Sequence, residues 1–425
     1  MSNTELKVQS PAETEHVLAP ISWKTPRILG VLAVLVVLFV VFSKGETQMY
    51  IETGVDYWKL PEITVPALAG TLIALVLCLL LAGYSWWTTS MRIKAGLWLP
   101  IVFGVVWVFA FLVWVGAGRG IPIQITGLLS GALFLSIPLI FGSLAGIVCE
   151  RVGVINVAIE GDLLFGAFLA AMVASATLNP WLGLIAAPIA GALVGSLLAL
   201  FAVKYWVDHI IVGVVLNVLV LGLTNYLYNG VIQATPELRE QVQLPDLPIP
   251  LLSEIPVIGP VFFSGTILLY LMYAAVIALQ FMLFRSRWGL RMRACGEHPE
   301  AADTVGIKVN RTRMRNTILG GAIAGLGGAY LTVGMGLTFT KEMSSGKGYI
   351  ALAAMILGKW NPKGAVAACL VFGFALNAQQ SLAIVNQEVP SQIMRMVPYL
   401  ITIIAVAGLV GKVRPPAMEG VAYKG

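Results

Sequence analysis

The sequence is poor in charged residues and in histidine. Only 11% of its 425 residues are Asp, Glu, Lys or Arg, whereas 58% are hydrophobic and the mean hydropathy is +0.87. These values exclude an ordinary water-soluble globular fold. The three histidines show no His-Glu-x-x-His spacing, and no pairing of a nucleophile with a base is recognisable. We therefore expect no catalytic residue, no metal site and no enzyme activity in this chain.

An ATP-binding P-loop is also missing. The Gly-Lys pairs that begin at 346, 358 and 411 are followed by Gly348, Trp360 and Val413, not by Ser or Thr. The chain therefore cannot bind ATP through this motif, and energy for any transport must come from a partner ATPase or an ion gradient. The cysteines lack the CxxC spacing of a metal site or of a disulfide framework, and they are predicted to be small buried residues.

Long apolar runs recur along the chain from residue 28 to residue 410. They are continuously apolar and do not alternate in period two, which favours spanning helices over a barrel. The predicted fold is an all-α, polytopic transmembrane helix bundle with about twelve spanning or near-spanning helices. The predicted segments are 28–43, 66–83, 95–117, 124–148, 157–178, 181–203, 208–228, 262–284, 316–337, 343–358, 364–385 and 393–411. The segment 343–358 is marginal, because its first residues include Gly346, Lys347 and Gly348.

The charge distribution predicts the orientation. With the N-terminus in the cytoplasm, twenty of the 27 Lys and Arg residues lie on the cytoplasmic side and seven on the other side. This asymmetry satisfies the positive-inside rule, and an even number of spans places the C-terminus in the cytoplasm as well. The net charge of +6 then results from loops near anionic membrane lipid, and no nucleic-acid partner is expected.

Four parts are predicted along the chain. Residues 1–27 form a polar cytoplasmic tail before a retained first helix, and residues 28–120 form a three-helix membrane extension. Residues 121–412, which are richer in glycine, form the main transmembrane domain, and 413–425 form a cytoplasmic tail. The loop 232–261 is rich in proline and acidic residues, as an external cap that faces a soluble partner would be.

The loop 285–315 is too long for a simple turn and carries eight basic residues. Its composition predicts two short helical elements, broken at Gly296 and Pro299. Two interpretations remain open on charge alone. The loop either fixes the orientation of the chain at the lipid surface or docks onto another protein.

The same loop carries a family resemblance. From Gly289 to Ile307 the pattern G-L-R-x-R-A-x-G-E-x-P-x-A-A-D-T-x-G-I resembles the cytoplasmic coupling region of bacterial ABC-importer permeases of the branched-chain amino acid and simple-sugar group. The stretches 150–161 and 348–362 and the ending Arg414-Pro-Pro are similar to the nucleoside-permease branch. The likeness covers about residues 127–416. The three N-terminal helices and Asp162, where an apolar residue is expected, depart from the family pattern.

This resemblance implies a set of partners. They are a second permease subunit, giving a heterodimer, a cytoplasmic ABC ATPase that binds ATP and magnesium, and an extracytoplasmic substrate-binding lipoprotein, all at a bacterial plasma (inner) membrane. The chain itself would bind no cofactor. The residues implied to couple to the ATPase are Gly289, Arg291, Arg293, Ala294, Gly296, Glu297, Ala301, Ala302 and Gly306.

Polar groups at membrane depth are the candidates for the substrate path. We name Asn156, Glu160, Asn217 and Asn377, because amides and one carboxylate suit a neutral ligand rich in hydroxyl groups. Helix capping accounts for the first two equally well, and hydrogen bonding between helices accounts for the last two.

The preferred hypothesis is a permease that forms the path for nucleosides by alternating access. A permease for ribose-like sugars is the alternative. A second class, an ion-coupled secondary transporter, would rely on Glu160 and Asp162 as its intramembrane acids.

Overall fold

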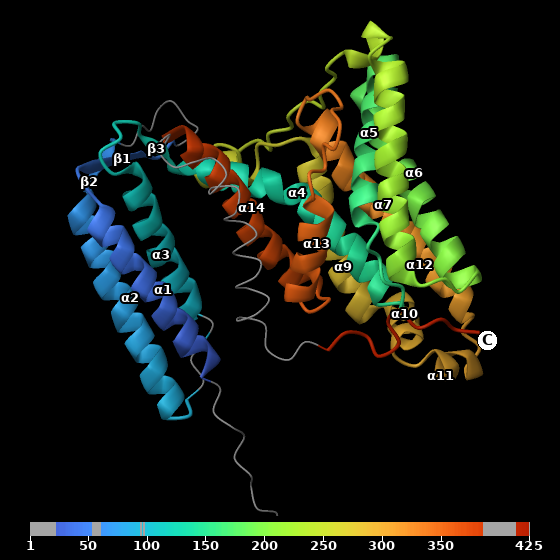
Figure 1. The fold of residues 1–425 in the computed structure, drawn as a ribbon, viewed down its shortest axis with the longest axis horizontal. Coiled ribbons are helices and arrows are strands. Elements are labelled where there is room, and N and C mark those ends of the chain that lie inside the picture. The colour runs from blue at the N-terminus through green and yellow to red at the C-terminus, as the bar shows by residue number, and fades with distance from the viewer. Residues whose placement is uncertain (1–22, 53–60, 94–95, 97, 386–413, 425) are drawn as a thin grey trace, which may run out of the picture. The chain divides into compact units, whose positions relative to one another are not determined.

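The computed structural model of the chain describes residues 23–52, 61–93, 96, 98–385 and 414–424 (Figure 1). Within those ranges, nine helices are long and apolar enough to cross a membrane, and each overlaps a predicted segment. The predicted all-α, polytopic membrane bundle is therefore confirmed. The last predicted segment, 393–411, lies outside the described residues.

The chain divides into two compact units, and the first contains Met1–Ser43 and Leu68–Phe111. Its helices are α1 (Lys24–Phe42), α2 (Ala67–Ser90) and most of α3 (Trp98–Gly116). A small apolar core joins them, formed by Leu29, Ala33, Val36, Ala74, Cys78, Phe103 and Ala110. Most of their other apolar side chains point outward, as expected for helices that face lipid.

The second unit contains Lys44–Ala67 and Leu112–Gly425. It begins with a small sheet in the order β2-β1-β3, which the sequence did not lead us to expect. Its strands are β1 (Glu46–Tyr50), β2 (Ile63–Pro66) and β3 (Ile123–Gln124). β1 pairs antiparallel with β2, starting at Glu46 opposite Pro66, and parallel with β3 at Met49 opposite Ile123.

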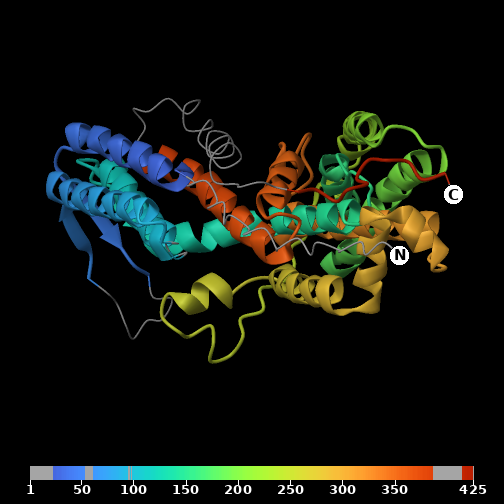
Figure 2. The same cartoon turned by 90° about the horizontal axis from the view of Figure 1, so that it is seen from below.

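Helices make up most of the second unit (Figures 1 and 2). In chain order they are α4 (Ile125–Glu150), α5 (Ile159–Thr177), α6 (Pro180–Ala199) continued by η1 (Leu200–Lys204), α7 (His209–Leu227) continued by η2 (Tyr228–Ile232), η3 (Pro236–Arg239), α8 (Ile258–Phe262), α9 (Ile267–Arg285), α10 (Arg287–Glu297), α11 (Pro299–Thr304), α12 (Val309–Ala329) continued by η4 (Tyr330–Gly334), α13 (Lys347–Leu357) and α14 (Pro362–Val385).

Glycine allows three of these helices to pack backbone against backbone. On α12, a Cβ at Gly325 would collide with the Ala187 carbonyl oxygen of α6, and one at Gly321 with the Gly191 carbonyl oxygen. A Cβ at Gly166 of α5 would lie 2.5 Å from the Gly325 oxygen. Glycine thus allows close backbone approach between α5, α6 and α12.

Two irregular predictions are also confirmed. The marginal segment 343–358 is the 11-residue helix α13, which is too short to span a bilayer by itself. The loop 285–315 forms two short helices, α10 and α11, which are separated at His298, with Pro299 in the first turn of α11. The predicted break at Gly296 is wrong, because Gly296 lies inside α10. Residues 309–315 belong to the first turns of α12.

Candidate functional site

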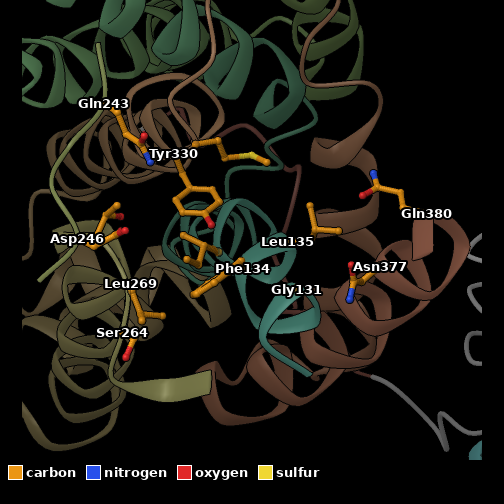
Figure 3. A pocket seen from close by; sticks show the side chains of 15 residues that line it. Gly131, Phe134, Leu135, Gln243, Asp246, Ser264, Leu269, Tyr330, Asn377 and Gln380 are labelled. Atoms are coloured by element: carbon orange, nitrogen blue, oxygen red, sulfur yellow. The ribbon is translucent and has the colours of Figure 1, made fainter. Parts of the chain in front are cut away.

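A cavity of about 390 Å³ lies within the second unit (Figure 3). It lies at the end of the bundle opposite α10 and α11. Helix α9 begins at the cavity and runs toward α10, and α12 begins after α11 and ends at the cavity. The lining residues are Gly131, Phe134, Leu135, Ile137, Gln243, Asp246, Ser264, Gly265, Thr266, Leu269, Tyr330, Gly334, Met335, Asn377 and Gln380.

Helices α4 and α14 build one wall. The Asn377 Nδ2 group donates to the Leu128 carbonyl at 2.8 Å and to the Gly127 carbonyl at 3.3 Å. A Cβ at Gly131 would lie 2.5 Å from the Asn377 amide, so glycine is what allows α14 to approach there. Since the amide nitrogen is committed to α4, a ligand would meet the carbonyl oxygen of Asn377.

The loop between η3 and α9 builds the opposite wall. The Leu244 amide donates to the Val333 carbonyl at 2.8 Å, and the Leu247 amide donates to the Gly265 carbonyl at 3.0 Å. These bonds hold the extended residues between them across the end of the bundle. Gln243 and Asp246 of this loop line the cavity together with Tyr330 (Figure 3).

The lining groups define what the cavity can bind. Two aromatic rings, Phe134 and Tyr330, offer flat apolar faces, and Asp246 is the lining carboxylate. The buried Thr266 hydroxyl has no hydrogen-bond partner within the described ranges. The volume is within the usual range for small-molecule sites. Such a cavity suits an uncharged ligand with a planar ring and several hydroxyl groups.

Of the four residues named for the substrate path, Asn377 lines this cavity and the other three do not. Asn217 is bonded through both ends of its amide. Its Oδ1 accepts from the Gly161 amide at 2.8 Å, and its Nδ2 donates to the Val157 carbonyl at 2.9 Å and to the Tyr349 hydroxyl at 3.1 Å. These bonds join α7 to the start of α5 and to α13.

Glu160 holds the start of α13. Its two carboxylate oxygens accept from the Gly346 amide at 2.8 Å and from the Gly348 amide at 2.6 Å. These amides belong to the N-cap residue and to the first turn of α13, and they have no partner within the helix. Asn156 is fully buried and donates to the Asp162 Oδ2 atom at 3.2 Å. The roles of these residues in transport stay predictions.

The polar cavity residues that sequence reasoning missed are mostly in the loop before α9. Gln243, Asp246 and Thr266 come from the proline-rich region and its end, where polar residues are common and none stands out. Asp246 stood out only as an acid of the external cap. The main-chain bonds that bring this loop to Tyr330 join residues far apart in sequence and leave no local pattern.

The residues named for coupling lie at the other end of the unit and differ in burial. Arg291, Ala301 and Gly306 are exposed, and Arg293, Ala294 and Glu297 are partly buried. Gly289, Gly296 and Ala302 are buried and pack inside the chain. Two exposed apolar side chains lie beside the exposed group, with 62% of Leu290 and 74% of Val305 accessible.

Similarity to known proteins is concentrated in the second unit. The sequence profile of the family described as branched-chain amino acid transport system / permease component matches residues 128–406. The nucleoside ABC transporter permease protein NupC of Lactococcus lactis is 38% identical over 309 residues, which are 70% of this chain and 96% of NupC. The guanosine ABC transporter permease protein NupQ of Bacillus subtilis is 37% identical over 304 residues, 68% of this chain and 94% of NupQ.

A relative with another named substrate is the putative glucose ABC transporter permease protein TsgC13 of Haloferax volcanii. It is 31% identical over 299 residues, 65% of this chain and 89% of TsgC13. No solved structure matches the chain significantly. The family profile covers most of α4, which carries the first cavity residues, and continues beyond α14. The chain is a multi-pass membrane protein that belongs to the branched-chain amino acid transport system / permease component family.

Proposed function

We propose that this chain is the permease subunit of an ABC importer and forms the translocation path for nucleosides. The observation that carries the proposal is the similarity to NupC and NupQ over nearly the full length of both relatives. The cavity supports it independently, because Phe134 and Tyr330 supply ring faces for a nucleobase, and amide, hydroxyl and carboxylate groups supply partners for a ribose.

The partners proposed are those of an ABC importer. A substrate-binding lipoprotein delivers the nucleoside to the cavity end, and a second permease completes the path. A cytoplasmic ATPase, which carries ATP and magnesium, docks on the exposed face of α10 and α11. Leu290 and Val305 would be its apolar contacts, and the neighbouring Arg291 and Lys308 would meet acidic groups. The complex would lie in a bacterial plasma membrane, and this chain would bind no cofactor.

The proposed mechanism is alternating access. ATP-driven closure of the ATPases displaces α10 and α11, and the bundle closes around the cavity and reopens toward the cytoplasm. The ATPase supplies the energy. The permease has two arrangements of the same helices, and the two arrangements bind the nucleoside differently.

Uptake of labelled guanosine tests the proposal in cells with and without this gene, and with the ATPase active or inactivated. We expect uptake that needs both proteins and is competed by unlabelled adenosine but not by leucine. Competition by glucose or ribose instead would favour a sugar permease, the candidate that the similarity to TsgC13 supports. Uptake that follows an ion gradient without the ATPase would favour a secondary transporter.

Variants of the cavity sharpen this test. Asp246→Ala removes a charged acceptor from the wall, and we expect the KM for guanosine to rise about tenfold, since a hydrogen bond to a charged group contributes about 1.5–3 kcal/mol. Glu237→Ala is the matched control, because Glu237 is an exposed acid of η3 outside the cavity lining. Equal KM values for the two variants would place the substrate elsewhere.

A further inference from the structure

The C-terminal segment binds the inner face of the coupling region. Three of its backbone amides donate hydrogen bonds to two separate elements. The Met418 amide donates to the Gly296 carbonyl at 2.9 Å, and the Ala417 amide donates to the Glu297 Oε2 atom at 3.2 Å, both at the end of α10. The Gly420 amide donates to the Gly153 carbonyl at 3.1 Å, in the loop between α4 and α5.

Arg313 fastens the same segment to α12. Only 1% of its side chain is accessible, and its Nη1 group donates to the Val421 carbonyl at 2.7 Å. Its Nη2 group donates to the Cys295 carbonyl of α10 at 3.4 Å. A buried guanidinium that joins two chain segments fixes their relative position, because moving either one would leave a charge without its partners.

Glu419 connects the segment to the end of α4. Its side chain is hydrogen-bonded to that of Glu150, which is buried and also accepts from the Trp360 Nε1 group at 2.5 Å. A hydrogen bond between two carboxyl groups requires a proton on one of them. Arg151 lies beside Glu419, and its Nε group donates to the Trp360 carbonyl at 3.0 Å.

We propose that residues 416–421 are a clasp that fixes α10 to the α4–α5 loop and to α12, so that a displacement of α10 by the ATPase reaches the helix bundle. This rests on the proposed function, in which α10 is the docking helix. Backbone packing supports it, since a Cβ at Gly296 would collide with the Arg151 carbonyl oxygen of the same loop. The α4–α5 loop is followed by Glu160 in the first turn of α5, and Glu160 binds the start of α13.

Hydrogen exchange of the purified chain tests whether the clasp orders α10. One variant ends after Arg414, and a second carries Gly420→Val, which places a side chain at a φ of +74° against Ile155. The control is Val421→Ala, because the Val421 side chain is 46% accessible and its carbonyl contact to Arg313 is retained. We expect α10 amides to exchange at least about tenfold faster in both variants and at the wild-type rate in the control. Unchanged exchange would overturn the clasp.

Transport measurements test its role. In membranes with the ATPase, we expect both variants to assemble and the ATPase to keep hydrolysing ATP, while uptake per ATP falls about tenfold, within the usual range of coupling between sites. Unchanged uptake per ATP, or loss of assembly, would overturn the transmitting role. Wild-type uptake that does not need the ATPase would overturn the proposed function instead. The exchange measurement needs no partner and would still decide whether the clasp forms.

Discussion

The two units of the chain bury polar groups and glycine in different ways. In the first unit, the buried Thr88 hydroxyl bonds to carbonyl groups of its own helix, and Gly104 of α3 has no atom within 4 Å of a Cβ position. In the second unit, the buried Ser143 hydroxyl donates to the Ala351 carbonyl of another helix at 2.7 Å, and Gly325 touches two helices.

This contrast distinguishes what helices need in order to lie in a membrane from what they need in order to transport a substrate. Lipid requires only that each helix satisfy its own backbone and present apolar side chains, which the first unit does. The first unit has a polar bond between helices too, from the Trp107 Nε1 group to the Leu32 carbonyl at 3.1 Å. The second unit adds close backbone contacts between helices, and these define an arrangement that can have a second state. The family profile also begins in the second unit, at residue 128. The machinery of transport is thus expected there.

The largest expected effect breaks a glycine contact. Gly325→Leu would push α12 from α6, and because the Ala187 carbonyl and the Gly191 amide nitrogen oppose the new side chain we expect a loss of about 3 kcal/mol or more in the free energy of unfolding. Gly104→Leu in the first unit is the matched control and should have little effect. Size-exclusion chromatography of solubilised membranes measures the folded fraction. Equal folded fractions for the two variants would remove the contrast between the units.

The next effect concerns Glu160. Glu160→Ala leaves the Gly346 and Gly348 amides without their acceptor, and we expect the free energy of unfolding to fall by about 1.5–3 kcal/mol. Glu160→Gln keeps one acceptor oxygen, and its stability should lie between those of the wild type and Glu160→Ala. Thermal unfolding in detergent measures both. Full stability of Glu160→Ala together with loss of guanosine uptake would instead assign this residue to direct contact with substrate.

A smaller effect is expected at Asp162. Asn156 Oδ1 and Asp162 Oδ1 are both buried without a partner in the described part of the chain, while Asn156 Nδ2 and Asp162 Oδ2 are bonded to each other. Asp162→Asn could close a ring of two hydrogen bonds, and we expect it to keep wild-type stability. Asp162→Ala leaves the Asn156 amide with only the Cys149 sulfur as a partner and should cost about 1–3 kcal/mol. Equal melting temperatures of these two variants would contradict the pairing.

The helices could be predicted because their signal is local. A run of apolar residues long enough to span a membrane is rarely anything but a spanning helix, and Pro299 marks the break between α10 and α11 within the coupling loop. The short strands β1 and β2 gave no such signal, because each has five residues or fewer and lies in a polar linker.

The site depends on contacts that no local pattern carries. Glu160 stood out as a polar group before an apolar run, but its partners lie 186 and 188 residues away. The ending Arg414-Pro-Pro stood out only as a family feature, and the closeness of the residues after it to Gly296 follows from the fold of the whole unit. Asn377 was found because an amide inside an apolar helix is rare, whereas Asp246 lies in a loop where acids are common.

The smallest expected effect that separates the two units is that of pH on the clasp. Among its described residues, the first unit contains no counterpart of the clasp. Burial raises the pKa of Glu419, and this effect outweighs the opposite effects of the Glu150 hydrogen bond and of the positive charge of Arg151. A pKa that is higher in the folded chain than in the unfolded chain stabilises at low pH, and this stabilisation is lost as pH rises through the folded value. We therefore expect α10 amides to exchange faster as pH rises, after correction for the intrinsic pH dependence of exchange.

Glu419→Gln can donate to Glu150 at any pH and should remove this dependence while keeping the clasp closed. A Glu419→Gln variant that retains the wild-type pH profile would show that a group other than Glu419 controls the segment.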